Sequence, residues 1–185
     1  MPAKAESGEP VSLELAKAHC RIETTADDTL IEQVYIPAAR QTVEEYTGRR
    51  ILSEPVVDIV LDSLASPYVI ALDLTPAYDL ASIIAIDDDG LRTSIDLVEY
   101  GARIVSTVLT SFVTTTKALP SPSAFEVSYS AGYAPGTCPP NLILAMLEFV
   151  GDAYENREAQ QSQATLTNNP RAVALMDPFR LTFGV

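Results

Sequence analysis

The chain has 185 residues, of which 47% are hydrophobic and 20% are charged. This composition is typical of a globular protein with one domain, or one domain with a large insertion, and it excludes a wholly disordered chain. Twelve Lys and Arg residues against 25 Asp and Glu residues give a net charge of -13 at pH 7. A surface this acidic repels phosphate backbones. It argues against a protein that reads nucleic-acid sequence, but not against one that surrounds DNA without binding it.

The two cysteines, Cys20 and Cys138, allow at most one disulfide. Residues 1–10 lack the charged and apolar regions of a secretion signal, so we expect a cytosolic protein with reduced thiols. The most apolar stretch, residues 141–150, contains Glu148 and is shorter than the roughly 20 residues that cross a bilayer. We therefore expect no membrane-spanning segment.

Two helices are predicted within the first 48 residues. Ser12 is a candidate N-cap for a short helix over residues 13–20. A longer apolar stripe follows Thr25, its candidate N-cap, and ends at Gly48, which supplies a C-terminal stop. Pro37 lies inside this second helix, where it removes a backbone hydrogen bond and predicts a kink.

After Gly48 the apolar residues recur at every second position, which predicts a β-rich region. Val57, Ile59 and Leu61 alternate with Asp58, Val60 and Asp62, the pattern of a half-buried strand. Further strands are predicted over residues 68–74, 82–87, 91–98, 103–109 and 125–129. The run Asp87–Gly90 predicts a hairpin turn. Residues 110–123 are rich in Thr, Ser and Pro, and we expect them to form a long exposed loop.

A third helix is predicted over residues 141–158, directly after Pro139 and Pro140. Its first half is apolar on almost every face, whereas a helix at the rim of a small domain needs only one apolar face. We therefore expect a second surface, from the β region or from another subunit, to cover the excess. The candidate inter-subunit residues are Leu142, Leu144, Met146, Phe149, Val150, Tyr154 and Arg157.

The C-terminal segment combines a polar linker, residues 159–169, with an apolar tail. Beyond such a linker the tail does not easily join the main core. It either folds back onto its own domain or docks into a groove on a partner, where aromatic residues and Arg carry most of the binding energy. The candidate docking residues are Arg171, Leu175, Met176, Asp177, Pro178, Phe179, Arg180, Leu181 and Phe183.

The order of these elements predicts an α+β fold. A small helical bundle scaffold would comprise residues 11–50 and 132–158, with a β-rich insertion, residues 51–131, between its second and third main helices. A flexible N-terminal arm, residues 1–10, would precede it, and an extended C-terminal tail, residues 159–185, would follow it.

The sequence offers little for catalysis or metal binding. His19 is the only histidine, so any nucleophilic triad would have to use it, and a structural or surface role is the favoured interpretation. A zinc site from His19, Cys20 and Cys138 would lack the usual paired-ligand spacing and a fourth ligand. We predict no catalytic residues, no metal site and no cofactor.

Two acidic features have both an ordinary and a functional interpretation. Asp87–Gly90 resembles a fragment of a calcium loop, but Ala85 stands where the first ligand is expected and strand-like flanks replace helices, so a solvated turn is favoured. Asp58, Asp62, Asp73 and Asp79 leave a glycosidase-type carboxylate pair open, although their abundance is expected at this composition. No glycine spacing matches a dinucleotide-binding motif or a P-loop.

Several segments, taken together, have the order and spacing of one protein family. They are Val11–Ile22, Asp27-Asp28, Leu30-Ile31, Ala38–Arg40, Val43–Arg49, Val127–Tyr133, Pro139-Pro140, Tyr154–Glu158 and Ala174–Arg180. Over about residues 11–181 they resemble the head–tail connector (adaptor) proteins of long-tailed phages and prophage-like gene transfer agents. Thr47-Gly48-Arg49 and Tyr154–Glu158 are the most specific. The chain departs from that family in having no Trp in the middle β region and in carrying Pro37.

The resemblance implies a structural protein without enzymatic activity. Family members form a ring, of about twelve subunits, beneath the portal at the capsid vertex, extend the DNA channel and provide a platform for the next neck or tail protein, the stopper. The implied partners are therefore other copies of the chain, the portal protein and the stopper, with no membrane. DNA would pass without specific binding, because a channel wall of like charge lets it slide. The implied location is the head–tail junction of a virion or phage-like particle, assembled in the host cytoplasm.

Two alternatives remain open from the sequence. One is another part of the same particle, such as a tail-completion or stopper protein, or a non-viral oligomeric binding module. The other is a small carboxylate-dependent hydrolase built on the β insertion, which would require a concave pocket with two close carboxylates of perturbed pKa.

Overall fold

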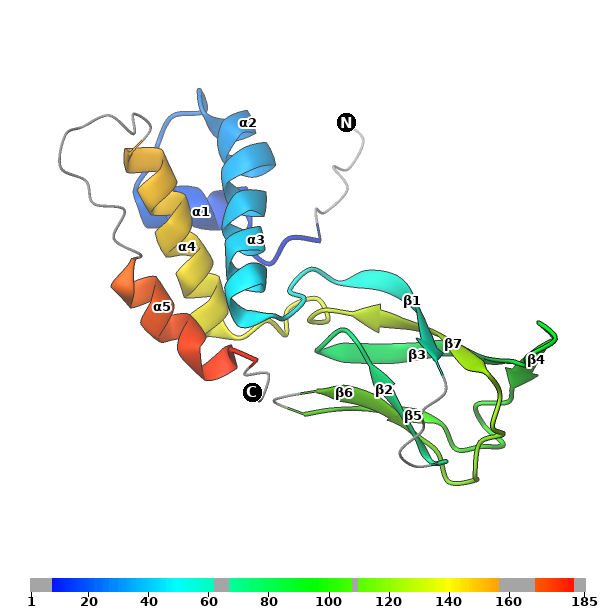
Figure 1. Cartoon of the computed structure of the whole chain (residues 1–185). Coiled ribbons are helices and arrows are strands. Elements are labelled where there is room, and N and C mark those ends of the chain that lie inside the picture. Colours follow the sequence, from blue (N-terminus) through cyan, green and yellow to red (C-terminus); the bar gives the residue numbers. More distant parts are fainter. Residues whose placement is uncertain (1–7, 62–66, 108–109, 157–168, 182–185) are drawn as a thin grey trace. The chain divides into compact units, whose positions relative to one another are not determined.

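The computed structural model describes residues 8–61, 67–107, 110–156 and 169–181 (Figure 1). The chain divides into two compact units, one formed by residues 1–52 and 135–185 and the other by residues 53–134. The first, the helical unit, contains all of the described helices, and the second, the β unit, contains two antiparallel sheets. These elements confirm the predicted α+β class.

The helical unit begins with α1, Leu13–Cys20. The hydroxyl of Ser12 accepts a hydrogen bond from the Leu15 N–H at 3.1 Å, which is the N-cap that the sequence predicts. The helix ends at Arg21, whose φ of 55° places it in the left-handed region. The ammonium of Lys17 then reaches Asp28 at 2.6 Å and ties α1 to the start of the next helix.

The second helix is continuous but irregular. It comprises α2, Asp28–Leu30, the π-helical segment η1, Ile31–Tyr35, and α3, Ile36–Thr47. Asp27 occupies the N-cap position, so the assignment of the cap to Thr25 is wrong by two residues. The irregularity expected at Pro37 takes the form of η1. There the Ile36 N–H bonds to the Ile31 carbonyl in a widened turn, directly before the residue that has no N–H to donate.

Gly48 ends α3 as predicted, with a φ of 71° and its N–H bonded to the Glu44 carbonyl at 2.8 Å. The remaining helices are α4, Pro140–Glu155, α5, Pro170–Met176, and a short 3-10 turn η2, Asp177–Phe179. Pro140 opens α4 at the position where a missing N–H costs least. Figure 1 shows α3, α4 and α5 side by side with α1 crossing α3 and α4, and α4 packs against α1, η1, α3 and α5.

The described residues of the β unit form seven strands, which Figure 1 labels. A four-stranded sheet has the order β1-β7-β3-β4 and a three-stranded sheet has the order β2-β6-β5, all antiparallel. The strands are β1 Glu54–Leu61, β2 Val69–Leu72, β3 Ala77–Ile86, β4 Arg92–Ile95, β5 Arg103–Ser106, β6 Ser111–Thr114 and β7 Ala124–Ala131.

One hydrophobic core joins the two sheets. Phe125, Val127 and Tyr129 of β7 alternate inward and are buried, and Ile70 and Val113 from the other sheet are buried in the same cluster. This alternation was predicted from the sequence, and the predicted hairpin turn is also present. The Asp87 N–H bonds to the Leu91 carbonyl at 3.0 Å, between β3 and β4.

Two predictions for this region are wrong. Residues 111–114 form β6, the central strand of the three-stranded sheet, instead of part of a loop, because Ser111 and Val113 alternate inward and are fully buried. The half-buried strand β1 exists, but its faces are reversed: Val56 and Val60 pack on the core, while Val57 and Ile59 are exposed. Residues 62–66 and 108–109, at the ends of two predicted strands, lie outside the described residues.

Candidate assembly surfaces

Helix α4, the predicted inter-subunit element, is largely enclosed by its own unit. Leu142, Met146 and Val150 are buried beneath the surrounding helices, which corrects their assignment to a subunit interface. The physical reason is that four elements of the same chain cover α4, and the apolar side chains on its several faces pack against helices that are distant in sequence. Leu144, Phe149 and Tyr154 are half-buried, and for them an inter-subunit role remains a prediction. Arg157 lies outside the described residues.

The C-terminal tail lies on this same unit. Asn169 caps α5 by accepting hydrogen bonds from the backbone N–H groups of Arg171 and Ala172, each at 3.1 Å. Ala172 and Met176 are buried, and α5 packs along α4. The expectation that the tail does not join the core is therefore wrong, and of the two alternatives the fold-back describes residues 169–181. Phe183 lies outside the described residues.

The segment Thr47-Gly48-Arg49 holds the end of this tail. The Thr47 carbonyl accepts from the Leu181 N–H at 2.8 Å, and the Arg49 Nε donates to the Phe179 carbonyl at 2.5 Å. Both Thr47 and Arg49 are buried. A methyl group added to Gly48 would lie 3.4 Å from the Leu181 Cβ, an ordinary contact distance, so it is the positive φ of 71° that favours glycine at this position. A sequence segment that resembles the family thus serves here to anchor the chain's own tail.

Tyr46 extends this anchor along α3. Its hydroxyl donates to the Asp177 carboxylate at 2.5 Å, and the Arg180 guanidinium lies 5.2 Å from the centre of its ring. The hydrogen bond to Asp177 is the main cause that raises the pKa of the Tyr46 hydroxyl. Arg171, Asp177, Pro178 and Arg180 are nevertheless exposed, whereas Leu175, Phe179 and Leu181 are half-buried. The tail therefore offers a mixed surface with two arginines.

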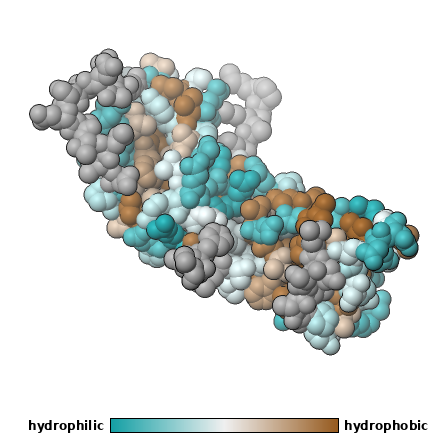
Figure 2. All heavy atoms as spheres, in the orientation of Figure 1, coloured by the Kyte–Doolittle hydropathy of each residue, from teal (hydrophilic) through white to brown (hydrophobic). Residues whose placement is uncertain are grey.

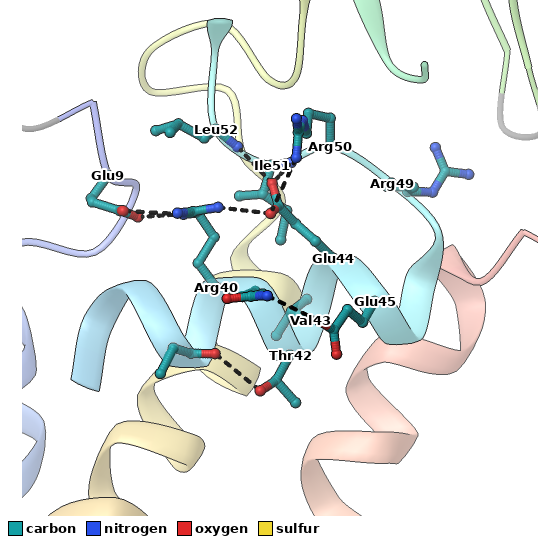
Figure 3. A network of polar contacts seen from close by, with 12 residues as sticks. Glu9, Arg40, Thr42, Val43, Glu44, Glu45, Arg49, Arg50, Ile51 and Leu52 are labelled. Atoms are coloured by element: carbon teal, nitrogen blue, oxygen red, sulfur yellow. Dashed lines mark hydrogen bonds and ion pairs between the residues drawn. The ribbon is translucent and has the colours of Figure 1, made fainter. Parts of the chain in front are cut away.

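A polar network fixes the chain on the other side of α3 (Figure 3). The Arg40 guanidinium bonds to Glu9 at 3.0 Å and to Glu44 at 2.7 Å. The other oxygen of Glu44 accepts from the backbone N–H groups of Ile51 and Leu52 at 2.7 and 3.2 Å. Burial lowers the pKa of Arg40, but the bonds and charges of the two carboxylates outweigh it and raise that pKa. The network joins the segment before α1, helix α3 and the chain that follows it.

The candidate catalytic and metal residues are dispersed. His19 is exposed on α1, Cys20 is half-buried next to it and Cys138 is buried. Over the described part of the chain, no group of three or more His, Cys, Asp or Glu side chains could hold a metal ion. Burial raises the pKa of the Cys138 thiol to about 11, and burial together with Glu155 raises that of Cys20. Neither shift favours a nucleophilic thiolate.

The carboxylates considered for a hydrolase have different surroundings. Asp58 of β1 faces the interior of the β unit, where it accepts a hydrogen bond from the Tyr129 hydroxyl. Asp73 and Asp79 are exposed, and Asp62 lies outside the described residues. Burial and the neighbouring Asp58 carboxylate raise the pKa of Tyr129. This pair was not found by sequence reasoning, because it depends on the face that β1 turns inward.

In the resolved stretches of the helical unit, and in those of the β unit, no helix has the length and apolar character needed to cross a membrane.

The charge is unevenly divided between the units. Residues 53–134 contain three Lys and Arg residues against eleven Asp and Glu residues, a net charge of -8, whereas the remainder of the chain carries nine against fourteen.

Comparisons with known proteins agree with this fold. A family model described as phage gp6-like head-tail connector protein matches residues 10–72. A solved chain described as "Neck of empty GTA particle computed with C6 symmetry" superposes with a TM-score of 0.72 at 18% identity, covering 99% of this chain and 95% of that chain. A chain of "Virion of native gene transfer agent (GTA) particle" gives 0.70 at 18%, with the same coverage. A chain of "Neck of native GTA particle computed with C12 symmetry" gives 0.69 at 17%, again covering 99% and 95%. No curated protein matches.

These likenesses extend over different parts of the chain. The family match includes Val11–Ile22 and Thr47-Gly48-Arg49, whereas the structural likeness also covers α4 and α5. At 17–18% identity the superpositions show a shared fold. The family match and the shared fold together confirm the resemblance to the head–tail connector proteins that the sequence indicates.

Proposed function

We propose that this chain is a structural head–tail connector (adaptor) in the neck of a phage or of a gene-transfer-agent-like particle. It would form a homo-oligomeric ring beneath the portal, extend the DNA channel and join the capsid to the next neck or tail protein. The observation that carries the proposal is the superposition of 99% of this chain on 95% of a particle-neck chain at a TM-score of 0.72. The family match over residues 10–72 supports it independently.

Two considerations support a ring: the symmetry of the related structures and the kind of contact that a ring requires. Two of these structures were computed with six-fold and twelve-fold symmetry, as their descriptions state. A ring requires a heterologous contact, in which two different patches of one chain meet on neighbouring copies. We expect about twelve subunits if the ring follows the portal-bound arrangement implied by the family resemblance.

A conduit for DNA is consistent with the charge. The net charge of -13 for the chain, concentrated in the β unit, disfavours adhesion of the phosphate backbone. Non-specific binding of duplex DNA should therefore be weak even at low salt, as a channel requires. No enzymatic step is part of this function.

The tail is our candidate for the portal contact. In the described conformation it presents Arg171 and Arg180 to solvent beside half-buried apolar residues. Deletion of residues 170–185 would also uncover α4, since Ala172 and Met176 are buried there. Point substitutions on the exposed side of the tail are therefore the sharper test of docking.

The function is tested by co-producing the full chain with the portal and capsid proteins encoded in the same genome. We expect electron micrographs to show a ring of this chain beneath the portal. The double variant Arg171→Ala and Arg180→Ala should join the particles at least about tenfold less well, because arginine anchors dominate such contacts. Arg103→Ala, at an exposed arginine of the β unit, serves as the matched control. Necks without this chain would refute the connector function, and normal incorporation of the double variant would refute docking through the tail.

A further inference from the structure

Strand β1 has the composition of a central strand but lies at the edge of its sheet. Val56 and Val60 pack on the core, and Val57 and Ile59 point to the other face, where they are 59% and 62% exposed. Strands that are apolar on both faces are typical of sheets covered on both sides. Among the described strands, β1 has one hydrogen-bonded neighbour, β7. Figure 2 shows the resulting hydrophobic surface over β1.

An edge strand of eight residues with two exposed apolar side chains invites pairing with a further strand. We propose that β1 pairs with β4 of a second copy of this chain, so that the four-stranded sheets of neighbouring subunits join edge to edge. This inference rests on the proposed ring and names the contact that builds it. Three observations favour this occupant over other strands.

The first observation is strand direction. Because each of the three pairings in the sheet is antiparallel, its edge strands β1 and β4 run in opposite directions. A second copy in the same orientation therefore presents β1 antiparallel to β4, and the alternation continues across the junction. The contact is head-to-tail, the kind that repeats from copy to copy and closes into a ring.

The second observation is charge. Strand β1 carries Glu54 and Asp58 and no basic residue, whereas β4 carries Arg92 and no acidic residue. Pairing β1 with another β1 would gather four carboxylates, whereas pairing β1 with β4 adds none. Asp58 lies on the inward face of the sheet and Arg92 on the outward face, so these two side chains do not meet. Like charges on neighbouring strands destabilise a sheet, which disfavours a β1–β1 pair.

The third observation is that the outward faces match. The register aligns Ile59 with Glu126, Glu126 with Ile84, and Ile84 with Ser94, so all four lie in one row on the same face of the sheet. In a joined sheet, Ile59 of one copy and Ser94 of the next would face the same side. Val57 and Ile59 would then be flanked by the β4 side chains of the neighbour, which reduces their exposure to water.

Cysteine cross-linking between full-length chains tests this contact. Chains carrying Ile59→Cys are mixed with chains carrying Ser94→Cys at the highest soluble concentration and treated with a short bismaleimide. We expect a cross-linked dimer in the mixture and none with either variant alone. The unsubstituted chain, which retains Cys20 and Cys138, controls for native thiols.

A second substitution separates the strand contact from general stickiness. Val57→Lys, added to the Ile59→Cys chain, should lower the cross-linked yield at least about tenfold, because the apolar contact is lost and a charge is added. Val98→Lys replaces an apolar residue that is 92% exposed in the turn after β4, outside both strands, and it should leave the yield unchanged. Both sites point to solvent, so circular dichroism should show that each variant folds.

Two results would overturn the inference. A cross-link formed by Ile59→Cys chains alone would mean that β1 pairs with β1, and the absence of any cross-link would mean that β1 does not pair with β4. The connector function is decided separately by the neck images. A ring whose subunits lack this cross-link would therefore reject the strand contact while the proposed function stands.

Discussion

Glu44 offers the sharpest test of how the helical unit is held together. It is only 9% exposed, yet its carboxylate accepts hydrogen bonds from the Ile51 and Leu52 N–H groups and from Arg40. Glu44→Ala leaves these donors without their acceptor in a site closed to water. Each buried donor left unsatisfied costs about 1–3 kcal/mol, so we expect a loss of about 3–5 kcal/mol in the free energy of unfolding.

Two further variants show whether the network is the cause. Glu44→Gln retains one acceptor oxygen for the backbone donors, and we expect it to lose about 1–2 kcal/mol. Glu45 is exposed on the same helix and accepts only from the Gln41 amide at 3.1 Å among the bonds resolved for it, so Glu45→Ala should change stability by less than about 0.5 kcal/mol.

The assay is urea denaturation followed by far-ultraviolet circular dichroism, which reports on the helices. This signal suits the chain because it has no Trp for fluorescence. A change in midpoint with an unchanged slope would indicate a pure loss of stability. A loss below about 1 kcal/mol for Glu44→Ala, or equal losses for Glu44→Ala and Glu45→Ala, would refute the reasoning.

Three further predictions follow from single residues. The pKa of the Tyr129 hydroxyl is raised by burial and by its carboxylate neighbour, so the stability that this hydroxyl contributes is complete below pH about 10 and is lost as the pH rises above it. Tyr129→Phe should therefore reduce the dependence of the free energy of unfolding on pH in this range, as measured by urea titrations at several pH values. Cys138, with a pKa raised to about 11, should be alkylated at least about tenfold more slowly in the native chain than in urea, as measured by mass spectrometry. Gly48→Ala should cost roughly 1 kcal/mol in thermal unfolding, about as much as Gly136→Ala, since both have positive φ and the methyl group at Gly48 would meet Leu181 at an ordinary contact distance. A cost at Gly48 well above that at Gly136 would contradict this reasoning.

The helices were predicted because their signals are local. Ser12 supplies a cap hydroxyl, Gly48 tolerates a left-handed backbone and Pro140 fits the first turn, and each acts within a few residues of its own position. The π-helical form of η1 was not predicted. The missing N–H of Pro37 signals a disturbance, but its form depends on how the surrounding helices pack.

The inward face of β1 could not be predicted from alternation. Val56 and Val60 are as apolar as Val57 and Ile59, so both faces of the strand fit a core. Pairing with β7, which aligns Val56 with Tyr129, decides between them, and a shift of one residue would exchange the faces. β6 was missed for a related reason, since four residues of alternating burial are too short to stand out among Ser and Thr.

The position of the tail depends on contacts between segments far apart in the sequence. Asn169 and Pro170 predict the start of a helix. No nearby residue indicates that α5 packs on α4, or that Thr47 and Arg49 bind the end of the tail. The polar residues between α4 and α5 suggest separation, whereas loop closure over such a length costs little compared with burying Ala172 and Met176.

The apolar excess that suggested assembly lies in a different place from the one expected. On α4 the apolar side chains are buried by helices of the same chain, so this helix by itself does not require another subunit. On β1 the apolar excess is not covered, because Val57 and Ile59 remain more than half exposed on an edge strand. Exposed apolar side chains stabilise an assembly when another surface covers them and removes them from water. An edge strand that pairs with a further strand forms backbone hydrogen bonds as well. If this chain forms a ring, the energetic case for its subunit contact is therefore stronger at the open edge of the β unit than at the helix with the greater hydrophobicity.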